Sequence, residues 1–207
     1  MFHDLLQAVD LKRSIFNAIV APRPIGWISS MGPDGHVNLA PFSHFNLVST
    51  APAVLIFSCN TPADRPEKDT LANVRATGEF VCNMVSRDLV EAMNTSSSPV
   101  PYGSNEFELA GVEPAPCVHV RPPRVKASPA AMECRLLRFA VIEPELPGET
   151  RSTVVFGRVV GLHIAEGFLD DQGRFDTARA RPVTRLGGAQ YAEAGPIFEL
   201  PSAFRKV

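Results

Sequence analysis

The distribution of proline constrains this chain more than any other feature. Its 207 residues include 19 prolines, and these are scattered between short runs of β-type residues. Proline breaks the interior of an α-helix because it has no backbone N–H and its ring clashes with the preceding turn. We therefore expect short helices at most, and strands separated by many turns.

Composition and charge are those of an ordinary globular protein. Hydrophobic residues make up 45% of the sequence and charged residues 20%, and the length is sufficient to bury one core. We therefore expect a single domain over residues 1–207. The net charge of -2 provides no general attraction to nucleic acid or to an anionic membrane, so neither partner is expected. Any site for an anion must be local.

The apolar runs and the cysteines both favour a cytoplasmic protein. Runs such as Ala53–Cys59 are too short to span a bilayer, and residues 1–10 lack the cationic start of a secretory signal. The cysteines are widely spaced and form no C-x-x-C pair, which argues against a zinc site or a disulfide framework. Free, buried thiols are expected at all of them. They are Cys59, Cys82, Cys117 and Cys134.

A polar hairpin is expected near the start of the chain. Residues 25–31 (IGWISSM) and 36–42 (HVNLAPF) flank the turn residues 32–35. Pro41 cannot donate to a strand ladder, so its strand should lie at a sheet edge or break there. A break frees backbone N–H groups, which could bind the carbonyls and ring nitrogens of a planar heterocycle. The polar side chains of the hairpin either join such a site or face water, and they belong to Ser29, Ser30, Asn38 and Ser43.

Later segments continue the strand pattern. Residues 53–59 form a continuous apolar run, as expected of a strand covered on both faces. Residues 130–143 alternate between apolar and polar side chains. Residues 152–166 carry valine on both faces, which favours a place inside the sheet. The order of elements predicts a mainly β protein with short helices, built as an antiparallel barrel rather than a βαβ fold.

Two short helices are expected between these strands. In the first, Asp69 caps the N-terminus, residues 70–77 form two turns and Gly78 supplies a left-handed stop. The second covers residues 86–94, with Ser86 as its cap.

The start of the first helix has features of a phosphate site. Lys68 directly precedes this helix and Thr70 lies in its first turn. A helix N-terminus offers free N–H groups and a partial positive charge. Charge-assisted hydrogen bonds contribute about 1.5–3 kcal/mol each, so several of them would hold a phosphate monoester. The alternative is an ordinary surface helix with a solvated lysine.

Signatures of several other chemistries are missing. The sequence has no G-x-G-x-x-G motif, no Walker loop and no G-x-S-x-G elbow. Its five histidines lie far apart, so neither a metal centre nor a catalytic triad is expected. We predict no catalytic acid, base or nucleophile, which suits a reaction whose chemistry is supplied by a cofactor.

Several motifs, taken in order, resemble those of one family. They are APRPIGWISS, NLAPFSHFNLVS and KDTLANVRATGEFVCN, followed by FGRVVGLHI and RPVTRLGGAQYA. Together they resemble the flavin reductase-like family, the FMN-binding split barrels, and more narrowly its flavoredoxin-type branch. The resemblance covers most of the chain. It implies a split β-barrel that forms a homodimer and binds FMN, sometimes FAD, near the subunit interface.

The resemblance also implies which residues contact the flavin. Residues 27–30 and 38–43 would flank the ribityl chain and the ring edge, and Ser58 with residues 68–70 would take the phosphate end. The implied cofactor-binding residues are Arg23, Trp27, Ile28, Ser29, Ser30, Asn38, Ala40, Pro41, Phe42, Ser43, Ser58, Lys68, Asp69 and Thr70.

Some residues keep two interpretations. Arg23 lies beside the ligand or forms a surface ion pair. Phe45 and Asn46 cover the flavin ring or fill the core, and Arg65 either joins the phosphate site or does not. His163 matches part of a G-D-H motif that faces the nicotinamide in many short relatives, and otherwise it is a half-buried strand histidine.

The implied activity is hydride transfer from NADH or NADPH to flavin N5, as in an NAD(P)H-dependent flavin reductase. Flavin and nicotinamide are the expected ligands, and an electron-acceptor protein or a monooxygenase component is a candidate partner. One alternative is an FMN-containing electron carrier that receives electrons from a partner protein. Another is a cofactor-free barrel that serves as an interaction module.

Overall fold

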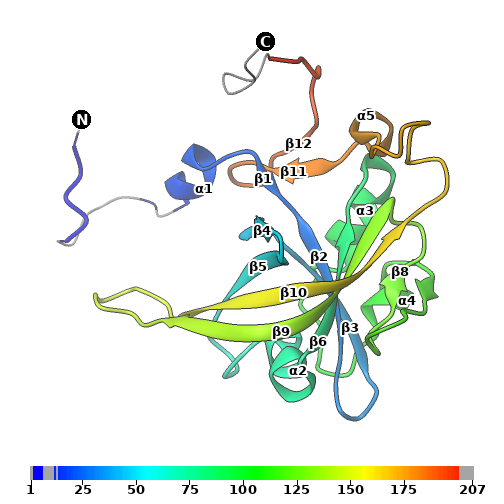
Figure 1. Cartoon of the computed structure of the whole chain (residues 1–207). Coiled ribbons are helices and arrows are strands. Elements are labelled where there is room, and N and C mark those ends of the chain that lie inside the picture. Colours follow the sequence, from blue (N-terminus) through cyan, green and yellow to red (C-terminus); the bar gives the residue numbers. More distant parts are fainter. Residues whose placement is uncertain (1, 7–11, 13, 201–207) are drawn as a thin grey trace.

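A computed structural model describes residues 2–6, 12 and 14–200 of the chain. Its main feature is a seven-stranded antiparallel sheet with the order β3-β2-β6-β9-β10-β5-β4 (Figure 1). The strands are β2 (Gly26–Met31), β3 (Val37–Phe42), β4 (Phe45–Thr50), β5 (Ala53–Asn60), β6 (Glu79–Met84), β9 (Ala130–Ile142) and β10 (Ser152–Ile164). The expected hairpin is confirmed as β2 and β3, and β10 lies inside the sheet as predicted.

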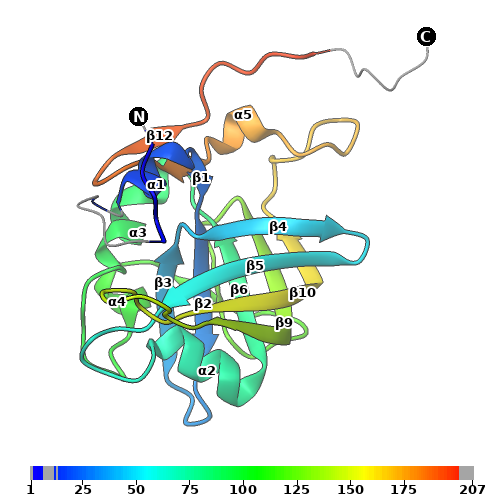
Figure 2. The same cartoon turned by 90° about the vertical axis from the view of Figure 1, so that its left-hand side faces the viewer.

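The strand order curls this sheet into a barrel with one open seam. β3 and β4 are its two outer strands, yet only Ser43 and His44 separate them in the chain. The sheet must therefore bend until its two edges approach each other, and Figure 2 shows β4 and β5 running across the direction of β2 and β3. No ladder joins β3 to β4, so the barrel is split. Pro41 lies in the edge strand β3, where a missing N–H donor is tolerated.

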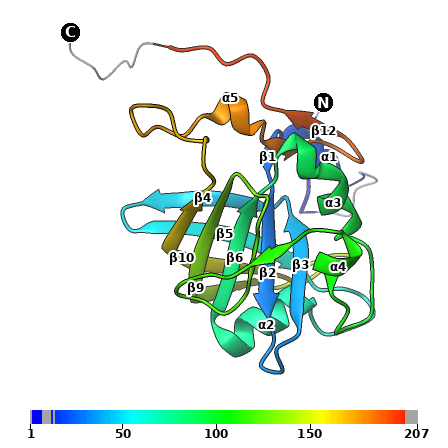
Figure 3. The ribbon, with the colours of Figure 1, turned by 90° about the vertical axis from the view of Figure 1, so that its right-hand side faces the viewer.

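Small sheets and short helices surround the barrel. One sheet contains β1 (Arg23–Pro24), β11 (Val183–Arg185) and β12 (Tyr191–Glu193), and another contains β7 (Pro114–Ala115) and β8 (Arg124–Val125). The helices are α1 (Ile15–Ile19), α2 (Asp69–Thr77), the 3-10 turn η1 (Arg87–Leu89), α3 (Val90–Thr95), α4 (Glu106–Leu109) and α5 (Thr177–Ala180). Helix α2 lies at one end of the barrel, and α1, α5 and the β1–β11–β12 sheet lie at the other (Figure 1, Figure 3). None of the helices in the described part of the chain has the length and hydropathy of a membrane-spanning segment.

The β2–β3 hairpin separates two hydrophobic cores. On the face toward α2, Phe57 and Phe80 pack edge to face with ring centroids 5.3 Å apart, in a cluster that includes Ile28 and Phe42. On the other face, Trp27 belongs to a second cluster with residues of α3 and α4. The neighbours Trp27 and Ile28 thus point into different cores, as the alternation of a strand requires.

Three local details differ from the sequence-based expectations. Lys68, rather than Asp69, occupies the N-cap position of α2, because the Lys68 backbone is extended whereas Asp69 already lies in the first helical turn. Ser86 lies at an N-cap, but its side chain makes no capping bond to η1. In β5, buried and partly exposed residues alternate, so only one face is fully covered. Gly78 does end α2 as predicted, with a left-handed φ of 72°.

The thiol prediction is confirmed for three of the four cysteines. All four are free, and Cys59, Cys82 and Cys134 are buried while Cys117 is only partly covered. Burial raises the pKa of Cys59 and of Cys82 to about 12. These two thiols therefore stay protonated and unreactive at neutral pH.

Candidate functional site

Polar side chains between the hairpin and α2 bond to one another. The Asn38 amide donates to the Thr70 hydroxyl at 2.8 Å, and the Asn73 amide donates to Ser30 Oγ at 3.2 Å. All four residues are buried, and we call them the α2 seam. Ala40, two residues after Asn38, packs against the core on the same face. Because these polar groups find partners within the chain, the seam stabilises the contact between hairpin and helix.

The start of α2 presents an accessible cation. Lys68 is exposed, and its Nζ lies 5.6 Å from the centroid of the Phe42 ring. The first-turn N–H groups of the helix lie beside it without intrahelical partners. Arg65 forms an ion pair of 3.1 Å with Asp69, so its charge is already matched. Of the three residues predicted to take phosphate here, Lys68 has an accessible side chain, Asp69 is paired with Arg65 and Thr70 is buried.

Four consecutive predicted residues, beginning with Trp27, have no exposed surface. Trp27 Nε1 donates to Ser96 Oγ at 2.9 Å, and Ser29 Oγ donates to the Pro123 carbonyl at 2.5 Å. Ser29 and Ser30 point to opposite faces of the sheet, as predicted. These four buried residues pack inside the fold and support the hairpin.

The end of β3 borders a cavity. Phe42 is buried in the core that faces α2, whereas its half-buried neighbours Pro41 and Ser43 line a cavity of about 430 Å³. The residues predicted from the hairpin are therefore divided between two faces of the sheet.

Ser58, on β5, shares a hydrogen bond of 2.9 Å with the hydroxyl of Ser152.

Arg23 lines the same cavity as Pro41 and Ser43. It is only 8% exposed, and its guanidinium donates to three backbone carbonyls. Its Nε has no hydrogen-bond partner among the described residues. The interpretation of Arg23 as half of a surface ion pair is wrong, because the residue is buried. The accepting carbonyls belong to Asn17, Val20 and Leu186.

A second arginine faces this cavity. Arg185 lines it together with Tyr191, and the Arg185 guanidinium carbon lies 4.3 Å from the centroid of the Tyr191 ring. The pKa of Arg23 is lowered mainly by burial and, to a smaller extent, by the positive charge of Arg185. We call the space bounded by Arg23, Pro41, Ser43, Arg185 and Tyr191 the arginine cavity. Sequence reasoning missed Arg185 and Tyr191 as site residues, although the motif RLGGAQY that contains them contributed to the family resemblance.

A second cavity, of about 360 Å³, is largely apolar and is lined by Phe45, Met84 and Leu162 among others. Phe45 also packs against the core and closely approaches Gly26, where an added Cβ would lie 2.6 Å from Phe45 Cδ2. Phe45 thus both packs on the core and borders a cavity. Asn46 is exposed and does not fill the core.

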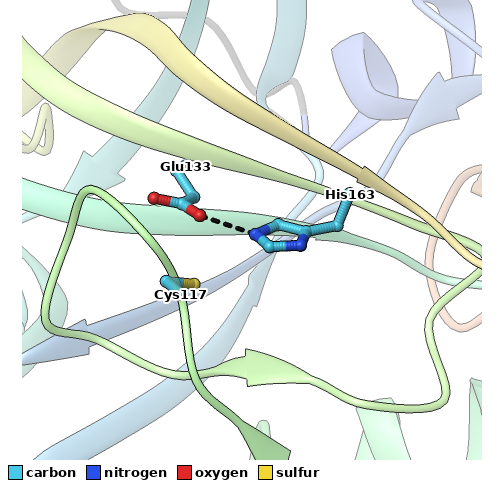
Figure 4. Close-up of side chains that lie close together, drawn as sticks. All are labelled: Cys117, Glu133 and His163. Carbon is cyan, nitrogen blue, oxygen red and sulfur yellow. Dashed lines mark hydrogen bonds and ion pairs between the residues drawn. The ribbon is translucent and has the colours of Figure 1, made fainter.

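His163 belongs to a cluster with Glu133 and Cys117 (Figure 4). His163 Nε2 lies 2.6 Å from Glu133 Oε1, and the same carboxylate accepts hydrogen bonds from the N–H groups of Val118 and His119. The candidate ligand atoms of the cluster lie within 4.8 Å of one another, so they could hold a metal ion. The hydrogen bonds already account for the buried carboxylate, and they fasten a loop to β9 and β10. Neither cavity described above includes His163.

Comparison with known proteins gives one consistent result. Residues 20–179 match the model of a family described as flavin reductase like domain. The structure is similar to nitrilotriacetate monooxygenase component B from Bacillus cereus, with a TM-score of 0.89 and 29% identity over 97% of this chain and 98% of that one. It is also similar to 2-nitrobenzoate 2-nitroreductase from Pseudomonas fluorescens, with a TM-score of 0.83 and 25% identity over 100% and 99%. Flavoredoxin of Desulfovibrio vulgaris shares the fold, with a TM-score of 0.73 and 20% identity over 99% of each chain.

Proposed function

Because the chain belongs to the flavin reductase like domain family, we propose that it is an FMN-binding oxidoreductase that takes hydride from NADH or NADPH. The main support for this proposal is the arrangement of side chains at the open seam of the barrel. Pro41 and Ser43 border a cavity there, and Lys68 lies over the ring of Phe42, the residue between them. A mononucleotide whose ring follows this end of β3 would have a cation beside it for its phosphate.

The groups at the open seam of the barrel suit the two ends of FMN. A phosphate needs N–H donors and positive charge, and Lys68 with the first turn of α2 offers both. The ring carbonyls and nitrogens need unpaired backbone groups, which an edge strand provides near Pro41 and Ser43. Arg23 lines the cavity together with Pro41 and Ser43, so it would lie on the side of the ring and not at the phosphate.

The other predicted residues support the ligand indirectly in this proposal. Trp27 and the three residues after it have no exposed surface, and they keep the hairpin in position. Three residues at the phosphate end have side chains that bond within the chain, so we propose that they offer their backbone groups. These residues are Ser58, Asp69 and Thr70.

The chain has few chemical tasks in such a reaction. FMN, when bound, supplies the hydride-accepting chemistry, so no protein nucleophile or general base is required. The residues at the open seam of the barrel must orient the flavin and leave one ring face open to a stacked nicotinamide. Backbone N–H groups near Pro41 and Ser43 would stabilise negative charge that develops at the ring edge.

A second candidate function is an electron carrier that binds FMN but receives electrons from a partner protein. The similarity to a protein described as a monooxygenase component favours a chain that works together with another protein. A carrier would bind FMN as the reductase does, but it would respond little to nicotinamides.

Titration of the purified protein with FMN, followed by anaerobic addition of NADH and NADPH to separate samples, tests the proposal. We expect one FMN per chain and loss of the flavin absorbance with at least one nicotinamide. Bound flavin that keeps its absorbance would support the carrier instead. Failure of the protein to bind FMN would contradict both functions.

A further inference from the structure

Arg23 and Arg185 bring two positive charges to one cavity. They are directly opposite each other in the antiparallel pair of β1 and β11, and both line the arginine cavity. Like charges at opposite positions destabilise a strand pair. In the part of the chain that the structure describes, neither arginine forms an ion pair with a carboxylate.

Hydrogen bonds within the chain do not neutralise this charge. The three carbonyls that accept from Arg23 stabilise its guanidinium but carry no net charge. The Nε atom of Arg23 remains without a partner among the described residues, although the side chain is buried. A buried charge is costly unless a counter-charge pairs with it. An anion bound in the arginine cavity would therefore relieve the repulsion between Arg23 and Arg185.

The remaining walls of the cavity indicate an organic anion. Ile25 and Met93 supply apolar surface, whereas Asn94 and Ser97 supply polar groups, and Tyr191 adds an aromatic ring. The volume of about 430 Å³ falls within the range of small-molecule sites, roughly 300–1,000 Å³. An inorganic ion would leave most of this space unfilled. A small molecule with an apolar body and one anionic group matches the lining.

We propose that the arginine cavity binds the carboxylate or phosphate group of a small organic substrate, with Arg23 and Arg185 as its counter-charges. This proposal rests on the proposed function, because Pro41 and Ser43 border both the cavity and the proposed flavin site. A substrate anchored by the two arginines would lie beside the edge of the flavin ring. The arginine pair would then select acidic molecules as electron donors or acceptors.

Calorimetric titration of the protein with benzoate, and separately with inorganic phosphate, tests this proposal. The variant Arg185→Met removes one charge and keeps a long side chain. We expect its affinity for the anion to fall about tenfold or more, because a charge-assisted hydrogen bond contributes about 1.5–3 kcal/mol. Tighter binding of benzoate than of phosphate would assign a carboxylate substrate, and the reverse order would assign a phosphate-bearing one.

Two further variants control for structural effects. Arg174→Met is the matched control, because Arg174 is exposed and forms an ion pair of 2.8 Å with Asp170. It should bind the anion as the wild type does. Arg185→Lys keeps the charge and should retain part of the affinity, so it also serves if Arg185→Met does not fold. Equal affinity in the wild type and Arg185→Met, or no binding of either anion to the wild type, would overturn the proposal.

Parallel titrations with FMN and riboflavin separate this proposal from the proposed function. The anion titration is done without flavin. Its result can therefore be interpreted even if the wild type does not bind FMN and the proposed function is wrong. If Arg185→Met weakened the binding of FMN but not that of riboflavin, the cavity would hold the phosphate of the cofactor. The substrate proposal would then be overturned.

Discussion

The two polar regions on opposite faces of the β2–β3 hairpin differ in how their groups are satisfied. In the α2 seam, Asn38 donates to Thr70 and Asn73 donates to Ser30, and all four side chains are buried. In the arginine cavity, Arg23 Nε has no partner among the described residues, and neither arginine forms an ion pair with a described carboxylate. The first region is complete without a ligand. The second carries an excess of positive charge.

This difference shows that residue type alone does not identify a ligand site. Small hydroxyls and amides in the hairpin resemble ligand-binding groups, yet Ser30 and Asn38 find partners within 3.2 Å in the same chain. Buried polar groups with such partners stabilise a fold without any ligand. A buried guanidinium without a counter-charge, as at Arg23, requires another explanation.

The largest effect is expected when Arg23 is removed. Arg23→Met would leave three backbone carbonyls without their donor, and we expect the free energy of unfolding to fall by about 2–4 kcal/mol. Denaturant unfolding measures this loss, and benzoate should stabilise the wild type more than the variant. A loss below about 1 kcal/mol would show that these hydrogen bonds contribute little.

Breaking the α2 seam should destabilise the protein without changing the arginine cavity. Asn38→Ala leaves the buried Thr70 hydroxyl without its donor, and we expect a loss of about 1–3 kcal/mol in unfolding free energy. Benzoate affinity should stay at the wild-type value. Asn46→Ala, at an exposed position, is the control and should change stability by less than about 0.5 kcal/mol. A weakened affinity for benzoate in Asn38→Ala would show that the two regions are coupled.

Removing the charge at the start of α2 should affect the cofactor more than the fold. Lys68→Ala should weaken FMN binding about tenfold, because it loses one charge-assisted contact with phosphate, and it should weaken riboflavin binding less. Fluorescence titration with both flavins measures the difference. Lys126→Ala, which removes an exposed lysine paired with Glu113 at 2.6 Å, is the control. The same loss for FMN and riboflavin would show that the phosphate lies elsewhere.

The polar groups around Glu133, like those of the α2 seam, are bonded within the chain, and their contribution to stability should depend on pH. Burial raises the pKa of Glu133, but the N–H groups of Val118 and His119 and the contact with His163 outweigh it and hold the pKa below the usual value of a glutamate. The stability from this carboxylate is present above the unfolded-state pKa and is lost as pH falls through the folded-state value. On acidification below about pH 4.5, the wild type should lose stability more steeply than Glu133→Gln. Parallel curves of melting temperature against pH would contradict this role.

Local patterns predicted most of the strands but not the arginine cavity. The hairpin and the edge position of β3 follow from turn residues and from Pro41, which act over a few residues. The N-cap of α2 was predicted one residue too late, at Asp69 instead of Lys68, because local propensity does not fix the exact residue at which a helix begins. Arg23 and Arg185 meet only through the pairing of β1 with β11. Such a long-range contact leaves no local signal in the sequence.

A crystal structure of the protein with FMN would show where the phosphate and the ring of the cofactor lie. We expect the phosphate within hydrogen-bonding distance of Lys68 at the start of α2, with the ring along Pro41 and Ser43. A ring inside the apolar cavity, or a phosphate held by Arg23 and Arg185, would contradict this expectation.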